Sequence, residues 1–550
     1  MSIQIKRGMK KDLPQLKDGE LAFCRDTKEL YVGNNGNENV SVTKKVEDRL
    51  DTVDSQLEHI ENNIIAITTS MSISDINAKL SNGGTFLFKG GTFLLDKGES
   101  ITVTSNSRLI FEPNAIIKYN YNQSTNYTIL DINGCENVII EDAYLIGCRD
   151  THVGTDGEWG YGIGITASRN IKIIRPRIEK TWGDGIYIGY KWNEVSPAFR
   201  TSNIEVLNSH ILNCSRNGIS ICSVDNLLID TAWIEGINRV NPMAAIDIEP
   251  ECGTEVLIHM SNITINNLTT KNNPVGIGTI MATNEQGCKG CKITVNNHIN
   301  YGGTAVSMWG DVGYEYEFIV NGGMYYDTQN VAINVVNTGL ASKKVFSDIK
   351  IIGKTKDSSG GDYSTHSAVK LSCNRNGNFG NVLFRNVLID TNGYNYVFSN
   401  PFSVVGTSSD GVTTQIQNIT IENFRTTGTQ GAMYLPNVDL NTFKANNLYI
   451  PVTSNYYLRD LNRTYYTDFT YTNLGDWSTV NITELLPDGV YTIRVLKSNG
   501  RYVMIHPKGG LSFTNGATSY TLKEGEFEFI KMGANITALR TGYNGGFNGL

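Results

Sequence analysis

The sequence predicts an all-β chain built around a right-handed parallel β-helix, a solenoid of stacked coils. Three observations predict it. A short apolar strand motif recurs at intervals of about 23 to 36 residues, and strands that begin with Asn interleave with that motif. The composition, with 18 % charged residues, 55 Gly and about 60 Asn, favours short strands joined by tight turns over helices.

Length and charge exclude several classes of protein. A chain of 550 residues is too long for one compact core, so it holds several domains or a repeat array. The net charge of −7 argues against a nucleic-acid-binding protein. We expect neither a signal peptide nor a membrane span, because the N-terminus is charged and no apolar run is long enough.

The cysteines indicate no disulfide framework. Nine is an odd number, so we expect buried thiols packed as small apolar groups. Cys288 and Cys291 form a CxxC without a second pair, so no metal site and no cofactor is predicted.

Two short segments precede the predicted solenoid. Residues 1–42 contain strand and turn signals and are expected to form a small module. Residues 43–67 carry apolar side chains at alternating spacings of four and three, a heptad seam: Val46, Leu50, Val53, Leu57, Ile60 and Ile64. Leu at a-positions and β-branched residues at d-positions favour a homotrimeric coiled coil. An amphipathic helix lying on its own chain is the alternative.

The solenoid is predicted over residues 68–460. Each copy of its main motif reads small, apolar, variable, apolar, and the copies begin at Gly162, Gly185, Gly218, Ala245, Ala305, Ala332 and Ala368, with one double-length step before Ala305. A second series of strands opens with Asn137, Asn170, Asn203, Asn226, Asn262 and Asn418. Such repeats cannot bury their apolar side chains alone, but stacked coils can. A β-propeller would need hairpin turns, which these repeats lack.

Both ends of the solenoid have distinct patterns. A helix-like sequence over residues 72–77 is expected to cap the first coils. Residues 461–550 alternate with period two between turns, and predict a small antiparallel β-domain for trimerisation or glycan binding.

The order of these parts resembles that of phage tailspikes of the pectate-lyase-like superfold. The resemblance lies in the sequences 3–8, Leu13-Pro14, 18–21 and 27–33, which are similar to an N-terminal module of phage tail fibre and receptor-binding proteins, and in the coiled coil and β-helix that follow. It implies that the N-terminus attaches to a tail or baseplate protein of the virion, and that a homotrimer binds or cuts a bacterial surface polysaccharide or teichoic acid. It does not supply the chemistry.

A candidate catalytic site follows from aligning the repeats. The variable, outward position is occupied in turn by Gly164, Tyr187, Ser220 and Asp247, and Glu249 follows Asp247 on the same face, with backbones about 7 Å apart. Two carboxyls so placed can act as acid and base, or as acid and nucleophile, on a glycosidic bond. Asp184 precedes the strand two coils earlier and is the third candidate.

Aromatic and basic residues gather on the same coils. Flat aromatic faces stack on sugar rings, and arginines bind anionic groups. The candidate substrate-binding residues are Trp159, Trp182, Trp192, Trp233, Tyr187, Arg216 and Arg239.

The first functional hypothesis is therefore a tailspike depolymerase that hydrolyses a polysaccharide with carboxylate acid and base. No Gly-His-Gly of the polygalacturonase-type hydrolases is present, and an acidic cluster with an Arg base would be needed for a calcium-dependent lyase, the second choice. An adhesin that uses the same groove without chemistry, and a structural tail protein that binds through residues 461–550 alone, remain open.

Overall fold

The computed structural model describes residues 5–34, 39–42, 64–155, 157–190, 200–250, 260–281, 290–310, 315–328, 331–354 and 367–375, and shorter stretches between 377 and 542. Of the coiled coil predicted over residues 43–67, residues 43–63 lie outside the described residues, as does Trp192, and residues 64–67 form strand β5 (Ile64–Ile67) instead of a helix. No helix among the described residues is long and apolar enough to cross a membrane.

The N-terminal module is a separate unit with one small sheet. Its strands are β1 (Lys6–Gly8), β2 (Leu21–Cys24), β3 (Leu30–Gly33) and β4 (Asn39–Ser41). β1 pairs parallel to β2, and the other neighbours are antiparallel. Its core is formed by Leu16, Ala22, Cys24 and Tyr31. The short strands expected for residues 1–42 are present.

Helix α2 (Ile73–Leu80) lies where the sequence predicts a cap. Ser72 and Asp75 form a capping box that satisfies backbone N–H groups at the helix start. The helix buries Ile73, Ile76 and Leu80. Asn77 ties it to the solenoid, since its side chain donates to Ser100 O and accepts from the backbone N–H of Thr102 in β8 (Ile101–Thr102).

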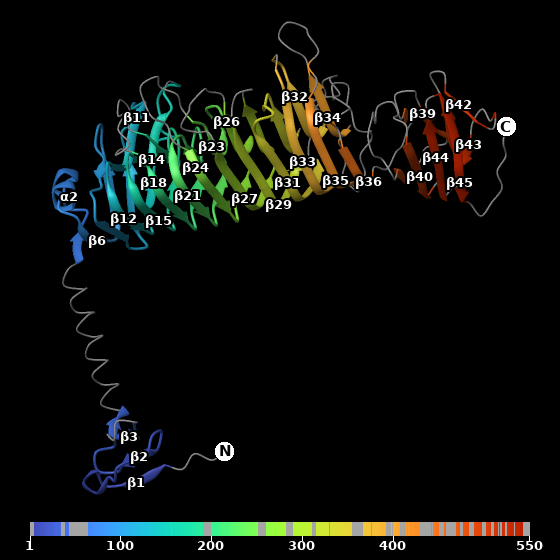
Figure 1. The fold of residues 1–550 in the computed structure, drawn as a ribbon. Coiled ribbons are helices and arrows are strands. Elements are labelled where there is room, and N and C mark those ends of the chain that lie inside the picture. The colour runs from blue at the N-terminus through green and yellow to red at the C-terminus, as the bar shows by residue number, and fades with distance from the viewer. Residues whose placement is uncertain are drawn as a thin grey trace. The chain divides into compact units, whose positions relative to one another are not determined.

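The solenoid consists of two stacks of parallel strands (Figure 1). One is an eleven-stranded sheet made of β8, β11 (Asn126–Asn133), β14 (Trp159–Thr166), β17 (Ile186–Gly189), β20 (Ile219–Ile221), β23 (Ala244–Ile248), β26 (Val275–Met281), β28 (Thr304–Gly310), β30 (Ile333–Val336), β32 (Ser367–Cys373) and β34 (Asn400–Gly406). We call it the site sheet. Each coil thus contributes one strand to this sheet.

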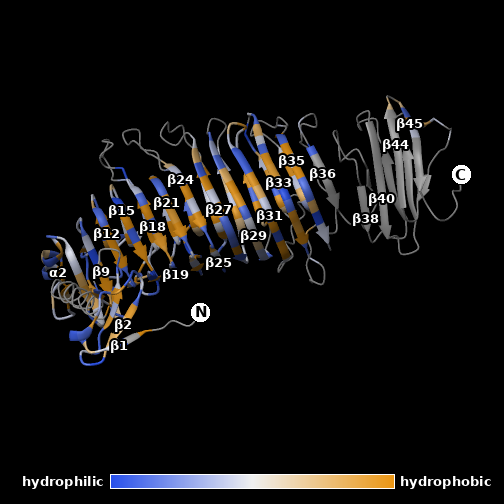
Figure 2. Cartoon of the chain, turned by 60° about the horizontal axis from the view of Figure 1, so that its bottom comes forward, coloured by the Kyte–Doolittle hydropathy of each residue, from blue (hydrophilic) through white to orange (hydrophobic). Residues whose placement is uncertain are grey.

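The remaining strands of each coil form the long sheet. Its parallel strands are β7 (Gly91–Leu95), β9 (Ser107–Phe111), β10 (Ala115–Tyr119), β12 (Glu136–Glu141), β13 (Tyr144–Ile146), β15 (Arg169–Ile174), β16 (Arg177–Glu179), β18 (Ser202–Leu207), β19 (His210–Leu212), β21 (Val224–Asp230), β22 (Trp233–Glu235), β24 (Met260–Asn266), β25 (Thr269–Lys271), β27 (Cys291–Tyr301), β29 (Tyr316–Thr328), β31 (Lys343–Lys354), β33 (Phe379–Asp390), β35 (Ile416–Thr427) and β36 (Lys444–Tyr449). Figure 2 shows the apolar residues along these strands. Their inward side chains form the continuous core expected of a solenoid.

The register explains the small residue that begins each repeat. Ile163, Ile186, Ile219 and Ile246 are direct neighbours on successive coils. A Cβ added to Gly185 would meet the carbonyl oxygen of Gly218 at 2.6 Å, so larger residues are excluded there. The double-length step before Ala305 contains one more coil, β26, which the motif search missed because Thr279 replaces its last apolar residue.

Asparagine ladders explain the unusual composition. Asn137, Asn170, Asn203, Asn226 and Asn262 all have positive φ values between 48° and 62°. Each side-chain amide donates to the Asn carbonyl oxygen of the preceding coil at 3.0 to 3.1 Å. Asn tolerates the left-handed backbone and also satisfies its neighbour, so the same residue type recurs at this turn.

Antiparallel pairing begins later than predicted at the C-terminal end. β38 (Phe469–Thr472) still pairs parallel to β36, and β40 (Gly489–Lys497) pairs parallel to β38. Antiparallel pairs form between β40 and β44 (Gly525–Met532), between β44 and β45 (Asn535–Gly542), and between β41 (Tyr502–Pro507) and β43 (Tyr520–Leu522). Period-two alternation fixes which side chains share a face but not the direction of the partner strand, so the antiparallel prediction for residues 461–550 holds for only some of the strand pairs.

The thiols are placed as expected. Seven cysteines among the described residues are free and buried, and none forms a disulfide.

Candidate functional site

The outward column predicted on the site sheet is confirmed in its geometry. Gly164 pairs with Tyr187, Tyr187 with Ser220, and Ser220 with Asp247, on the successive strands β14, β17, β20 and β23. Gly278 of β26 continues the column beyond Asp247. The alternation of inward Ile and outward variable residues is therefore kept over five coils.

A polar network joins this column to the turns before the strands. Asp184, fully buried in the turn before β17, accepts from the backbone N–H of Asn217 at 3.1 Å and from Arg216 Nη1 at 3.2 Å. Asn217 in turn donates from Nδ2 to Asp247 Oδ2 and to Ser220 Oγ, both at 3.0 Å. Its Oδ1 accepts from the backbone N–H of Ala244. Three consecutive coils are thus connected through Asn217, whose backbone N–H reaches one neighbouring coil and whose side chain reaches the other.

Asp247 is the member of this network with the strongest tendency to hold a proton. It is 1 % exposed, and its Oδ1 is buried without a hydrogen bond within the described residues. Burial raises its pKa to about 8, with a further rise from the charge of Glu249 that Arg216 only partly offsets. At neutral pH this carboxyl is largely protonated.

Asp184 differs because its charge is compensated. Burial raises its pKa to about 6, while Arg216, Ser220 and Asn217 oppose the rise. Both of its oxygens already accept hydrogen bonds. Asp184 is therefore placed to hold Arg216 and Asn217 in position rather than to touch a ligand.

Arg216 links the buried carboxyls to solvent. Its guanidinium lies 3.2 Å from Asp184, 3.3 Å from Glu158 and 3.8 Å from Glu249. Burial acts to lower its pKa, but the surrounding carboxylates outweigh burial and raise it above the ordinary value. The Arg216 side chain is 13 % exposed and that of Glu249 is 29 % exposed. Solvent therefore reaches Glu249, and also Glu158, whose side chain is 36 % exposed.

Chemically, the arrangement provides two carboxyl groups in different environments. Burial raises the pKa of Asp247 to about 8, and Glu249 lies next to the guanidinium of Arg216. Environments that separate two carboxyls in this way are what acid and base roles require. Among the described residues no group of three or more His, Cys, Asp or Glu side chains could hold a metal ion. The positive charge beside these carboxylates comes from the guanidinium of Arg216.

Tyr187 belongs to an aromatic pair on the same sheet. Its ring stacks on that of Tyr161 with centroids 4.8 Å apart and planes 9° apart. Gly164, on the same strand as Tyr161, is the direct neighbour of Tyr187, and a Cβ added to it would meet Thr128 at 3.1 Å. The pair stands two strands away from Asp247 and can support a sugar ring.

The tryptophans do not form the single cluster that their sequence positions suggested. Trp159 starts β14 and is 49 % exposed. Trp182 is 2 % exposed, because His152 stacks on it at 3.7 Å and Arg239 lies over its ring at 5.4 Å. Trp233 starts β22 of the long sheet, so it faces away from the site sheet. Trp182 is therefore corrected to a packing residue, and Trp233 is removed from the candidate groove.

Sequence reasoning missed Glu158. It contacts Arg216 from the segment between β13 and β14, which is longer than the turns that precede β17, β20 and β23. A column alignment contains no signal for a residue contributed by such an insertion. Arg216 and Asp184, by contrast, were found because both precede strands of the aligned series.

Two family descriptions match this chain. Residues 3–34 match the major tropism determinant N-terminal domain, and residues 63–267 match the right-handed β-helix region. Two proteins of Bacillus subtilis (strain 168) are also similar: the uncharacterized protein YclG, 29 % identical over 163 residues, and the SPbeta prophage-derived protein YorA, 27 % identical over 258 residues. These alignments cover 28 % and 44 % of this chain, and 28 % and 43 % of the relatives, so the chain spans less than half of their length.

Solved structures with a similar trace are all distant. They include the surface adhesin PfbA of Streptococcus pneumoniae, 12 % identical with a TM-score of 0.44 over 67 % of this chain and all of that chain. The N-terminal fragment of gene product 12 of bacteriophage Phi29 is 13 % identical with a TM-score of 0.43 over 80 % of this chain and 85 % of the fragment. No argument about function rests on these likenesses. The chain therefore has the right-handed parallel β-helix fold, and its N-terminal match and its prophage-derived relative show similarity to phage-associated proteins.

Proposed function

We propose that this chain binds a bacterial cell-surface polysaccharide along the site sheet and hydrolyses it, with Asp247 as general acid and Glu249 as base or nucleophile. The observation that carries the proposal is the Asp247 environment: a carboxyl with a pKa raised to about 8, an unpartnered oxygen, and a second carboxylate two residues away. A carboxylic acid that stays protonated at pH 7 is what leaving-group protonation needs.

Asp184 supports this proposal as a positioning residue. It fixes Arg216 and Asn217, which in turn fix the charge of Glu249 and the orientation of Asp247. Hydrolysis is favoured over a lyase mechanism for a physical reason. An arginine that abstracts a proton must first lose its own, and the carboxylates around Arg216 raise its pKa instead.

Assembly and location are part of the same proposal. The N-terminal module would attach a homotrimer to a tail or baseplate protein of the virion, and the solenoid would act at the host cell surface. The matched N-terminal domain supports this, because the chain carries it ahead of the solenoid.

The second candidate function is a non-catalytic adhesin. The burial of Asp247 favours it, since a side chain that is 1 % exposed reaches a glycosidic bond only if the bound glycan displaces the groups that cover it. The outer face would then bind the glycan without cutting it.

The experiment separates the two functions by products and by binding. The purified chain is incubated with capsule or teichoic acid from the host, and new reducing ends or oligomers are measured. Hydrolysis predicts products that disappear in Asp247→Asn and Glu249→Gln and persist in Asp225→Asn, a control on the long sheet. Binding without any product, unchanged in both site variants, would establish the adhesin and reject the enzyme.

A further inference from the structure

Two arginines beside the site sheet have no acidic partner. Arg149 donates to Gly236 O at 3.1 Å and, from Nη2, to Asn238 Oδ1 at 2.6 Å. Arg239 donates to the backbone oxygen of Arg149 at 2.8 Å and lies over Trp182. Neither guanidinium forms an ion pair within the described residues, whereas nearby Lys180 is paired with Asp150 at 2.7 Å.

The positive charge of Arg239 lowers the pKa of two neighbouring groups, Arg149 and His152. Burial lowers the pKa of Arg149, and the charge of Arg239 lowers it further. The same two causes lower the pKa of His152, which stacks on Trp182 and stays neutral at pH 7. Two like charges held together by aromatic and carbonyl groups repel each other, so an anion placed between them is stabilised by both.

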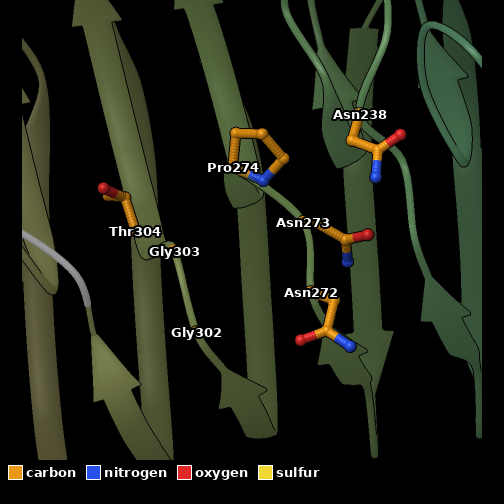
Figure 3. A pocket seen from close by; sticks show the side chains of 7 residues that line it. All are labelled: Asn238, Asn272, Asn273, Pro274, Gly302, Gly303 and Thr304. Carbon is orange, nitrogen blue, oxygen red and sulfur yellow. The ribbon is translucent and has the colours of Figure 1, made fainter. Parts of the chain in front are cut away.

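A pocket of about 390 Å³ begins at the same turn. Figure 3 shows it, with Asn238, Asn272 and Asn273 along one side and Thr304 on the other. It spans the turns of three successive coils, about 10 Å along the solenoid. The remaining lining residues that the structure describes are Pro274, Gly302 and Gly303, so no charged and no aromatic side chain is found among the described lining residues.

The hydrogen bonds around the pocket define what it offers. Arg149 occupies Asn238 Oδ1, which leaves the Nδ2 donor. The Oδ1 of Asn273 accepts from the backbone N–H of Ile237, and its Nδ2 donates to the carbonyl oxygen of Ile234. Asn273 therefore lines the pocket with its amide already hydrogen-bonded. Asn272 donates only a long bond of 3.4 Å to Glu235, which leaves its carbonyl oxygen as an acceptor. Neutral donors and acceptors of this kind match sugar hydroxyl or acetamido groups.

We propose that Arg149 and Arg239 bind an anionic group of the glycan, a carboxylate or a phosphate, while the Asn238 pocket holds the neutral sugar next to it. This rests on the proposed function in that the ligand is a surface polysaccharide, and it assigns that polysaccharide to the acidic class. The anion site and the pocket follow one another along the solenoid, as two units of one polymer do.

The test measures binding of the full chain to polymers of defined charge by affinity electrophoresis. The probes are polygalacturonate for carboxylate, glycerol-phosphate teichoic acid for phosphate, and dextran as a neutral polymer. We expect retardation by at least one polyanion and none by dextran. Arg239→Gln should weaken polyanion binding at least about tenfold, the loss expected for a charge-assisted hydrogen bond.

Arg239 is the better probe because Arg149 also braces three coils, and its loss could disturb the fold. Arg177→Gln removes the same charge on the long sheet, where Arg177 pairs with Glu179, and should bind like the wild type. Retardation by dextran equal to that by the polyanions, no retardation by either polyanion, or an Arg239→Gln variant with unchanged binding would each overturn the inference.

These outcomes differ from failure of the proposed hydrolysis. If no product forms but Arg239→Gln weakens polyanion binding, the anion site stands and the enzyme does not. If the host glycan is cleaved and Arg239→Gln binds it like the wild type, the enzyme stands and the anion site does not.

Discussion

The variant Asp247→Asn should make the protein more stable at neutral and alkaline pH, although it removes the proposed acid. The pKa of Asp247 rises from 3.8 to about 8 in the fold, so between these values the folded state holds a proton that the unfolded chain releases. The stability of the wild type therefore falls as pH rises through this window and levels off above pH 8. An Asn side chain does not titrate, so the variant does not lose this stability as the pH rises.

The magnitude follows from the same numbers. At pH 7 the difference of about three pH units from the unfolded pKa corresponds to about 4 kcal/mol. The new amide offsets part of this, because the site of Oδ1 offers no hydrogen-bond partner and an unsatisfied buried group costs about 1–3 kcal/mol. A net stabilisation of about 1–3 kcal/mol at pH 7 is expected.

The assay is the thermal unfolding midpoint of both proteins from pH 4 to 9. The Tm of Asp247→Asn relative to wild type should increase across this range and change sign from lower to higher. Asp225→Asn, which alters a half-exposed carboxyl on β21, should show no such trend. A Tm difference that does not vary with pH would show that Asp247 titrates near its ordinary value and would remove the basis for its role as an acid.

Three further outcomes follow from named contacts. Arg216→Met should lower the free energy of unfolding by about 3–5 kcal/mol at pH 7 because it leaves Asp184 buried without its cation, and adding Asp184→Asn should restore part of that loss in denaturant unfolding. Asn203→Gly should cost about 1–3 kcal/mol for its two ladder hydrogen bonds, and Asn203→Ala about 1–2 kcal/mol more because its φ is 55°; equal effects would contradict the ladder account. Gly303→Ala should lower the Tm and abolish the pocket in a crystal structure, since φ is 67° and its Cβ would meet Asn273 O at 2.0 Å.

The repeat made most of the fold predictable. Because coils stack in register, residues at the same place in the motif share a column, and Asp247 could be placed beside Ser220 from the sequence alone. The same logic placed Asp184 and Arg216 near that column. The small first residue of each repeat is required by a close backbone contact, and the Asn at each turn by a positive φ. Both requirements are local, so the sequence pattern reveals them.

The repeat did not predict which outward side chains are buried, or on which side of a coil a residue lies. A column position says that a side chain points outward from the core, but not that a neighbouring turn covers it, and so Asp247 was expected at the surface and is buried. Trp182 and Trp233 were expected in one cluster, yet they lie two coils apart, one in a turn under His152 and the other on the long sheet. The spacing of the repeats assigns a residue to a coil, but it does not indicate on which side of that coil the residue lies.

The central claim is that the outer side of the site sheet, from Glu249 at the end of β23 to the Asn238 pocket before its start, binds the glycan. A crystal structure of the full chain soaked with oligosaccharides of the host surface polymer tests it most directly. The account predicts density beside Glu249 and Arg216 that continues over Arg239 into the pocket. Sugar found instead on the strands beyond residue 461, or on the long sheet around Trp233, would contradict it.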